Sequence, residues 1–119
     1  MMENERHTLI PVDQMKWEPG IYENTEQAYL WEDEITGQVC FLVKLHPGSY
    51  IPFHKHPRRE IAYMVDGEMI LNETDVMKKG DFLTAGPNEG HDVRTETGAM
   101  LLIYIDYNVE YQKIVRIKQ

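Results

Sequence analysis

Residues 48–60 of this chain read GSYIPFHKHPRRE and form the most informative stretch of the sequence. His54 and His56 stand two residues apart. Because side chains on an extended strand repeat their direction every two residues, both imidazoles are predicted on one face. Glu60 follows a turn-like interruption at residues 57–59 and opens the next apolar segment. Its carboxylate is therefore expected to return toward the two histidines across a tight corner.

A third histidine, His91, follows the turn at residues 88–90 and begins another apolar segment. Three imidazoles with one carboxylate suit a divalent transition metal such as Fe, Mn, Ni, Zn or Cu. The absence of a thiolate argues against a structural zinc site of the cysteine-rich kind, and an incomplete protein shell would leave positions for water or substrate. The predicted ligands are His54, His56, Glu60 and His91. The remaining histidines, His7 and His46, are expected to lie outside the site.

Short apolar segments rich in Val, Ile, Tyr and Thr alternate with turn signals along most of the chain. The segments are 28–31, 38–45, 60–65, 68–71, 75–77, 82–85, 91–95, 99–107 and 109–117. This pattern, without a long stretch of helical period, predicts an all-β sandwich or barrel. Asp66-Gly67 between two apolar runs predicts a hairpin with a type I′ turn. Residues 1–22 are polar and proline-containing and are expected to be an N-terminal arm, with a single barrel domain over residues 23–119.

Length and charge narrow the functional classes. A chain of 119 residues corresponds to one domain, and a 42% hydrophobic share fills its core without disulfides. Lys and Arg number 12 against 20 Asp and Glu, for a net charge of −8, which argues against a nucleic-acid or membrane partner. The single Cys40 excludes an intramolecular disulfide, and no apolar run is long enough to span a membrane. The polar N-terminal residues show no secretory signal, so the cytoplasm is the expected location.

The spacing around the histidine pair resembles the first motif of the cupin superfamily, G-x5-H-x-H-x3-E-x6-G. Gly48, His54, His56, Glu60 and Gly67 meet its positions. The second motif, G-x5-P-x-G-x2-H-x3-N, is matched in part.

In that second motif Gly80 and His91 keep the required separation. The proline comes one place late at Pro87, Asn88 replaces the second glycine, and Thr95 replaces the final asparagine. Since Asn tolerates left-handed backbone geometry nearly as well as Gly, the turn can survive the exchange. The resemblance implies a double-stranded β-helix, or jelly-roll barrel, with the four predicted ligands around one metal inside it.

Strand alternation extends the expected interior beyond the ligands. Ala62 and Met64 should face inward with Glu60, and Val93 and Thr95 should follow His91. On the last long strand, the inward set is either Met100, Leu102 and Tyr104 or Leu101, Ile103 and Ile105. Residues that could line the mouth of the pocket are Tyr50, Phe53, Arg58, Arg59 and Arg94.

An apolar pocket around a His-rich metal suits dioxygen chemistry, and the first functional hypothesis is an enzyme similar to the small cupin dioxygenases that acts on a chelating small molecule. The alternative is a non-catalytic ligand-binding or regulatory cupin, similar to the zinc-binding cupin of an anti-sigma factor. A third reading is a purely structural metal. Cupins usually cover their sheet edges by dimerising, so a homodimer is expected through Ala99–Ile117 and the arm.

Overall fold

A computed structural model describes residues 6–107 of the chain. Within that range the structure contains nine strands and one short 3-10 helix, η1. Their bounds are η1 Val12–Gln14, β1 Glu18–Pro19, β2 Thr25–Asp33, β3 Gln38–Leu45, β4 Tyr50–His54, β5 Glu60–Leu71, β6 Asp75–Lys78, β7 Phe82–Ala85, β8 His91–Arg94 and β9 Ala99–Asp106. The all-β prediction is confirmed for this part of the chain. The apolar segment expected at 109–117 lies outside the described residues.

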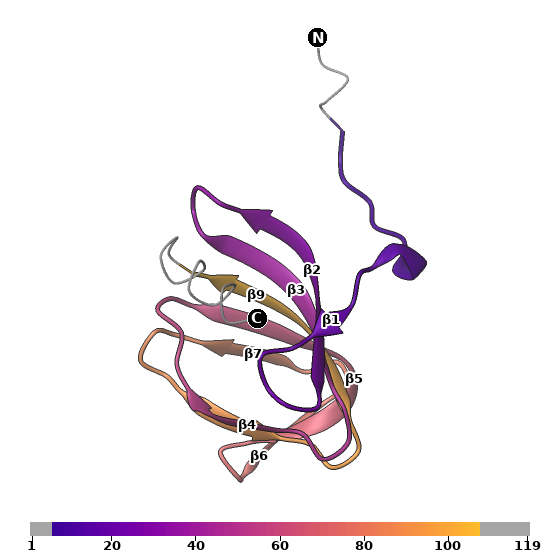
Figure 1. Cartoon of the computed structure of the whole chain (residues 1–119). Coiled ribbons are helices and arrows are strands. Elements are labelled where there is room, and N and C mark those ends of the chain that lie inside the picture. Colours follow the sequence, from indigo (N-terminus) through magenta and orange to yellow (C-terminus); the bar gives the residue numbers. More distant parts are fainter. Residues whose placement is uncertain (1–5, 108–119) are drawn as a thin grey trace.

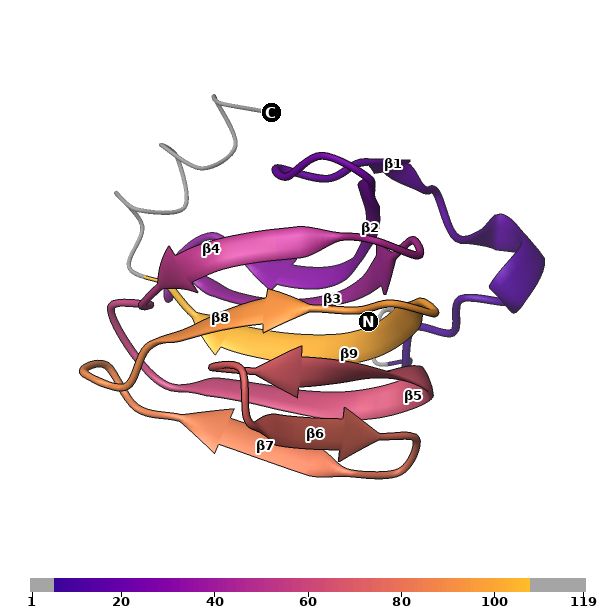
Figure 2. The same cartoon turned by 90° about the horizontal axis from the view of Figure 1, so that it is seen from below.

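The strands form one strongly curled sheet in which β1, β2, β3, β9, β5, β8 and β4 follow one another as hydrogen-bonded neighbours. β6 and β7 pair with β5 outside this sequence. The curl brings β4 and β8 across from β2 and β3, so the sheet wraps round a central space (Figures 1 and 2). Because the two ends of the sheet approach each other, residues far apart in the sequence face the same interior.

The strand β5 makes the sheet turn its corner. Its first residues pair with β7 and β9, whereas its last residues pair with β6 and β8. The predicted hairpin at Asp66-Gly67 is wrong, because β5 continues through both residues with an irregularity between Met64 and Asp66. Gly67 adopts φ +83, and a Cβ there would lie 2.2 Å from the Gly98 carbonyl oxygen. The glycine is therefore used for a bulge and a close backbone approach rather than for a two-residue turn.

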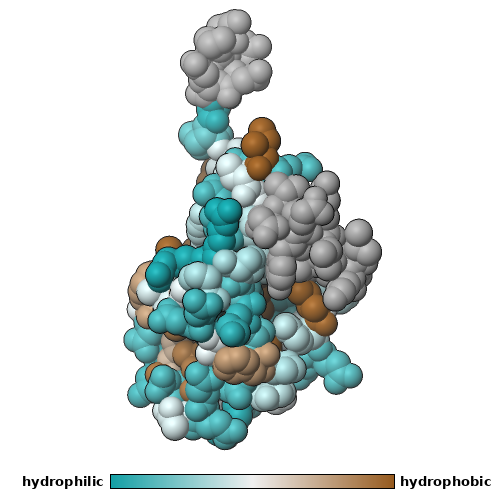
Figure 3. Space-filling model, turned by 90° about the vertical axis from the view of Figure 1, so that its left-hand side faces the viewer, coloured by the Kyte–Doolittle hydropathy of each residue, from teal (hydrophilic) through white to brown (hydrophobic). Residues whose placement is uncertain are grey.

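The described residues ahead of β1 extend away from the barrel. In Figure 1 residues 6–17 project from the body, and β1 then pairs antiparallel with β2. The face seen in Figure 3 is mostly hydrophilic, with hydrophobic residues in separate groups. No helix in residues 6–107 is long and apolar enough to cross a membrane.

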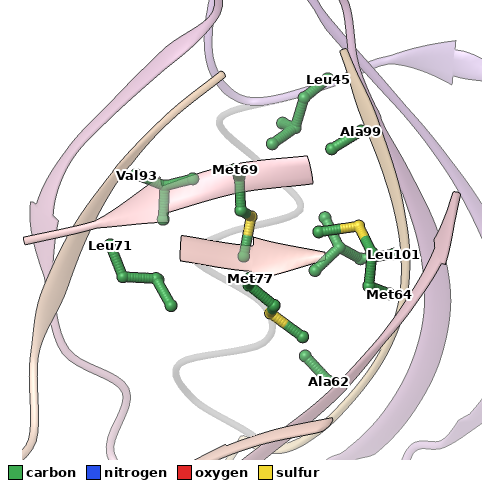
Figure 4. Close-up of a cluster of buried hydrophobic side chains, with 9 residues drawn as sticks. All are labelled: Leu45, Ala62, Met64, Met69, Leu71, Met77, Val93, Ala99 and Leu101. Atoms are coloured by element: carbon green, nitrogen blue, oxygen red, sulfur yellow. The ribbon is translucent and has the colours of Figure 1, made fainter. Parts of the chain in front are cut away.

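The main hydrophobic cluster fills one end of the interior (Figure 4). Its buried members are Leu45, Ala62, Met64, Met69, Leu71, Met77, Val93, Ala99 and Leu101. The predicted inward alternation on β5 is confirmed, since Ala62 and Met64 are buried while Ile61 and Tyr63 are exposed. On β9 the structure selects the set with Leu101 and Ile105, because β9 pairs with β3 and β5 in the register that buries them.

Candidate metal centre

The ends of three strands bring the predicted ligands together. His54 is the last residue of β4, and His91, the first residue of β8, is its antiparallel partner. Glu60 is the first residue of β5, and His56 lies in the loop between β4 and β5. The four side chains therefore converge although 30 residues separate Glu60 from the last histidine in the sequence.

Close spacing around the Glu60 carboxylate defines this cluster. Glu60 Oε1 lies 3.4 Å from His91 Nε2 and 3.8 Å from His56 Nε2. The ring centre of His54 is 4.9 Å from that of His91 and 5.1 Å from that of His56. The Glu60 side chain is only 6% exposed, so its charge has little access to water.

His54 and His56 do not share a strand as predicted. β4 ends at His54, and its pairing with β8 is irregular between Ile51 and His54, where Pro52 cannot donate to the ladder. The strand therefore stops before His56, and the loop carries this imidazole to the cluster. The other two histidines lie outside the pocket, since His7 is exposed and His46 contacts the Glu26 carboxylate.

Hydrogen bonds hold the His54 ring and the backbone on either side of His91. His54 Nδ1 lies 2.9 Å from the Pro52 carbonyl oxygen, which can only accept, so Nδ1 carries the hydrogen and Nε2 keeps its lone pair. Asn72 holds both sides of His91: its Nδ2 donates to the Gly90 carbonyl, and its Oδ1 accepts from the Asp92 amide. Sequence reasoning missed Asn72, because the contact between residue 72 and residues 90–92 depends on the pairing of β5 with β8.

Burial sets the protonation of the metal-free cluster. It raises the pKa of Glu60 to about 7. Burial, followed by the nearby His54 and His91, lowers the pKa of His56 to about 4. The pKa of His91 is lowered in the same way, by burial first and by His54 second. The two histidines are therefore neutral at pH 7 and their lone pairs are available, while Glu60 is close to half-ionised.

The donor set fits a divalent transition metal, because three imidazoles and one carboxylate are ligands that Fe, Mn, Ni and Zn all accept. Two buried atoms of the cluster, Glu60 Oε1 and His56 Nδ1, have no hydrogen-bond partner. Ligand bonds of about 2.1 Å put neighbouring ligand atoms about 3.0–3.5 Å apart, close to the Glu60–His91 separation. Within residues 6–107 no group of three or more His, Cys, Asp or Glu side chains is arranged so that it could hold a metal ion. Side-chain movements would be needed to complete one.

The cluster opens onto a pocket of about 130 Å³. One ordered water occupies roughly 10–15 Å³ of such a cavity, so the pocket can hold a small organic molecule. The wall comes from seven strands and is mostly apolar, with Phe41, Val43, Met69, Val93, Leu101 and Ile103 among its residues.

The mouth of the pocket differs from the prediction. None of the five candidates, Tyr50, Phe53, Arg58, Arg59 and Arg94, lines the cavity. Arg58 pairs with Asp106, and Arg59 donates to Thr84. The cavity is lined instead by Ile21 and Tyr22 ahead of β2, and by the buried Thr25 and Gln27 on β2. No signal in the sequence linked these residues to the histidines.

A profile of the ChrR cupin-like domain matches residues 5–108 of the chain. The chain belongs to this cupin family. The double-stranded β-helix predicted from the motifs is thereby confirmed, and solved cupin structures agree with it. An RmlC-like cupin from Shewanella frigidimarina aligns with a TM-score of 0.75 at 18% identity, over 89% of this cupin and 96% of that chain.

Other solved structures share the fold across different roles. A putative acetylacetone dioxygenase from Methylibium petroleiphilum aligns with a TM-score of 0.74 at 14% identity, over 84% of this cupin and 76% of that chain. The complex of Rhodobacter sphaeroides SigE with the anti-sigma ChrR contains a chain that aligns with a TM-score of 0.68 at 21% identity. This match covers 81% of the cupin but only 51% of that chain. No curated protein sequence matches significantly.

Proposed function

We propose that this cupin holds one divalent transition metal, Fe, Mn, Ni or Zn, and binds a small organic molecule beside it. The proposed ligands are His54, His56, Glu60 and His91. The observation that carries the proposal is Glu60 Oε1, a buried carboxylate oxygen without a hydrogen-bond partner between the Nε2 atoms of two histidines. An unpaired buried polar atom is destabilising, and a cation bound by all four groups would give Glu60 Oε1 the partner that it lacks.

Dioxygenase-like chemistry is the reaction class that the pocket favours. A redox-active metal would supply the reaction with dioxygen, which protein side chains cannot perform alone. The chain's own residues keep bulk water out with the apolar wall, and Glu60 supplies the negative charge that balances a cation. The hydrogen bond from His54 Nδ1 to Pro52 leaves Nε2 of that ring free for a metal. The fold of the putative acetylacetone dioxygenase is consistent with this reaction class.

Metal content and oxygen consumption test this proposal. Protein purified without chelator should contain about one divalent metal per chain by elemental analysis. The iron-loaded protein should consume oxygen when given a β-dicarbonyl from a panel of different chain lengths. Folded protein with negligible metal after loading would contradict the site, whereas tight metal binding without oxygen uptake would contradict only the dioxygenase reaction.

A regulatory sensor is the second candidate, and the ChrR cupin-like family match favours it. One structural neighbour comes from a complex between SigE and the anti-sigma ChrR. In a sensor the same cluster would bind zinc and the signal would pass to a protein partner. Tight zinc binding, with no oxygen uptake for any redox metal or substrate, would favour this function.

We also propose a homodimer in the cytoplasm. The outer face of β5 and β7 exposes Ile61, Tyr63 and Phe82, and exposed neighbouring apolar side chains are typical of contact surfaces. A second copy could cover them and the adjacent outer face of β9. Sedimentation at micromolar concentration should show a dimer that Tyr63→Lys weakens, and a monomer at that concentration would contradict it.

A further inference from the structure

Gln27 is a buried polar side chain in the pocket that the metal-ligand cluster does not use. It lies on β2, is 4% exposed and lines the cavity. Its Nε2 donates to the Tyr29 hydroxyl at 3.4 Å, and no other side-chain hydrogen bond of Gln27 is found among the described residues. An amide side chain offers two donor hydrogens and an acceptor oxygen. Most of this capacity is therefore unused and is available to a molecule in the pocket.

Gln27 and Glu60 stand at different levels of the barrel. Gln27 pairs with Val43 on β3, whereas Glu60 pairs with Ile105, whose partner on β3 is Val39. The two side chains are thus four residues apart along β3. A molecule with its head at the histidine cluster would therefore present a different part of its length to Gln27.

Among residues 6–107, the wall between these levels has no positive side chain. In that part of the chain no Lys or Arg lines the cavity, and Glu60 is the only carboxylate that does. A negative group at the far end of a ligand would therefore lose its water without gaining a cation, which is strongly unfavourable. An uncharged group that both donates and accepts hydrogen bonds would match the Gln27 amide.

From this geometry we infer that the pocket selects an uncharged, mainly apolar small molecule, and that Gln27 determines specificity by hydrogen bonding to a hydroxyl or carboxamide at the end remote from the histidine cluster. The inference rests on the proposed function, because it places the ligand's oxygen-bearing head at the cluster. It adds the chemistry of the other end of the ligand molecule, which the four proposed metal ligands do not determine.

Three probes with one β-diketone head and different tails test the inference. They are heptane-2,4-dione with a methyl end, 4,6-dioxoheptanamide with a carboxamide end and 4,6-dioxoheptanoate with a carboxylate end. Calorimetry on the metal-loaded protein should show that the carboxamide binds at least about tenfold more tightly than the carboxylate. Gln27→Leu should weaken only the carboxamide, by about tenfold, because it loses the hydrogen bonds to the tail.

Gln38→Leu is the matched control, since Gln38 begins β3 and does not line the pocket. It should leave all three affinities unchanged. Thermal melting of the ligand-free Gln27→Leu protein should stay at or above the wild-type value, because leucine is similar in size and brings no unsatisfied amide. This variant separates ligand recognition from a merely structural role, which would lower the melting temperature and weaken all probes equally.

Equal affinities for carboxamide and carboxylate would overturn the inference, and so would an equal loss for all tails in Gln27→Leu. Failure of every probe to bind would overturn it as well. Metal content is measured separately in each protein and should be unchanged by Gln27→Leu. Loss of metal from the wild type would instead contradict the proposed function, so the two failures are distinguishable.

Discussion

The two ends of β5 face very different interiors. At one end Glu60 is buried against two histidines, and its Oε1 has no hydrogen-bond partner. From Met64 to Leu71 the same strand contributes Met64, Met69 and Leu71 to the main hydrophobic cluster, and Met69 also lines the pocket wall. The apolar end stabilises the fold by close packing, whereas the polar end is destabilising until something binds there. The apolar half of the strand therefore mainly stabilises the fold, and the end with Glu60 is the one proposed to bind metal, which the following predictions test.

The largest effect is expected at the apolar end. Met64 is fully buried, so Met64→Ala should lower the free energy of unfolding by about 2–5 kcal/mol through lost contacts and a cavity. Denaturant titration measures the change. Metal per chain should remain the same at temperatures where the variant is folded, and a parallel loss of metal would show that the two ends are not separate.

In metal-free protein Glu60→Gln should raise the free energy of unfolding, the opposite of the effect of Met64→Ala. Because folding raises the pKa of Glu60 from 4.5 to about 7, the buried carboxylate destabilises the fold fully above pH 7 and not below pH 4.5. The variant should gain up to about 3 kcal/mol over the wild type at pH 8, and the gain should disappear toward pH 4.5. Chemical denaturation at several pH values measures it, and a gain that does not vary with pH would contradict the raised pKa.

His91→Ala should remove the stabilisation that metal provides. Metal that binds only the folded state adds about 2.7 kcal/mol at one hundred times its dissociation constant. His46→Ala is the control, because His46 contacts Glu26 away from the pocket and should leave this increment intact. Melting curves with and without added metal measure the difference. The ligand assignment would be wrong if metal raised both variants equally.

The smallest effect is the pH dependence of metal affinity. His56 is already neutral near pH 6, since its pKa is about 4, whereas Glu60 with a pKa of about 7 still holds a proton. The Glu60 proton alone should therefore lower the affinity by about tenfold for each pH unit below 7, because metal binding displaces it. Calorimetry in buffers of different ionisation heat counts that proton. Metal binding at pH 6 without proton release would contradict the raised pKa of Glu60.

Several parts of this fold could be read from local pattern. The segments at 38–45 and 82–85 coincide with β3 and β7, because alternation and flanking turns depend only on neighbouring residues. The turn signal at Asp66-Gly67 was misread, since a positive φ serves a bulge as well as a hairpin. Which of the two forms depends on β9, which pairs on both sides of the irregularity.

The residues of the candidate site could likewise be predicted only in part from the sequence. His54, His56, Glu60 and His91 could be selected from spacing, and the structure brings them together, although metal binding by them stays a prediction. Gln27 and Asn72 could not be selected, because each reaches the pocket or its ligands through strand pairing with distant segments.

The sequence by itself determined an all-β chain and a set of metal-type donors, because side-chain period and residue chemistry are local properties. Only the tertiary structure decided that His56 enters from a loop, that β2 completes the pocket wall and that no Lys or Arg of residues 6–107 faces it. These features depend on how far the sheet curls and where each strand bends. Both are set by packing between residues that are remote along the chain.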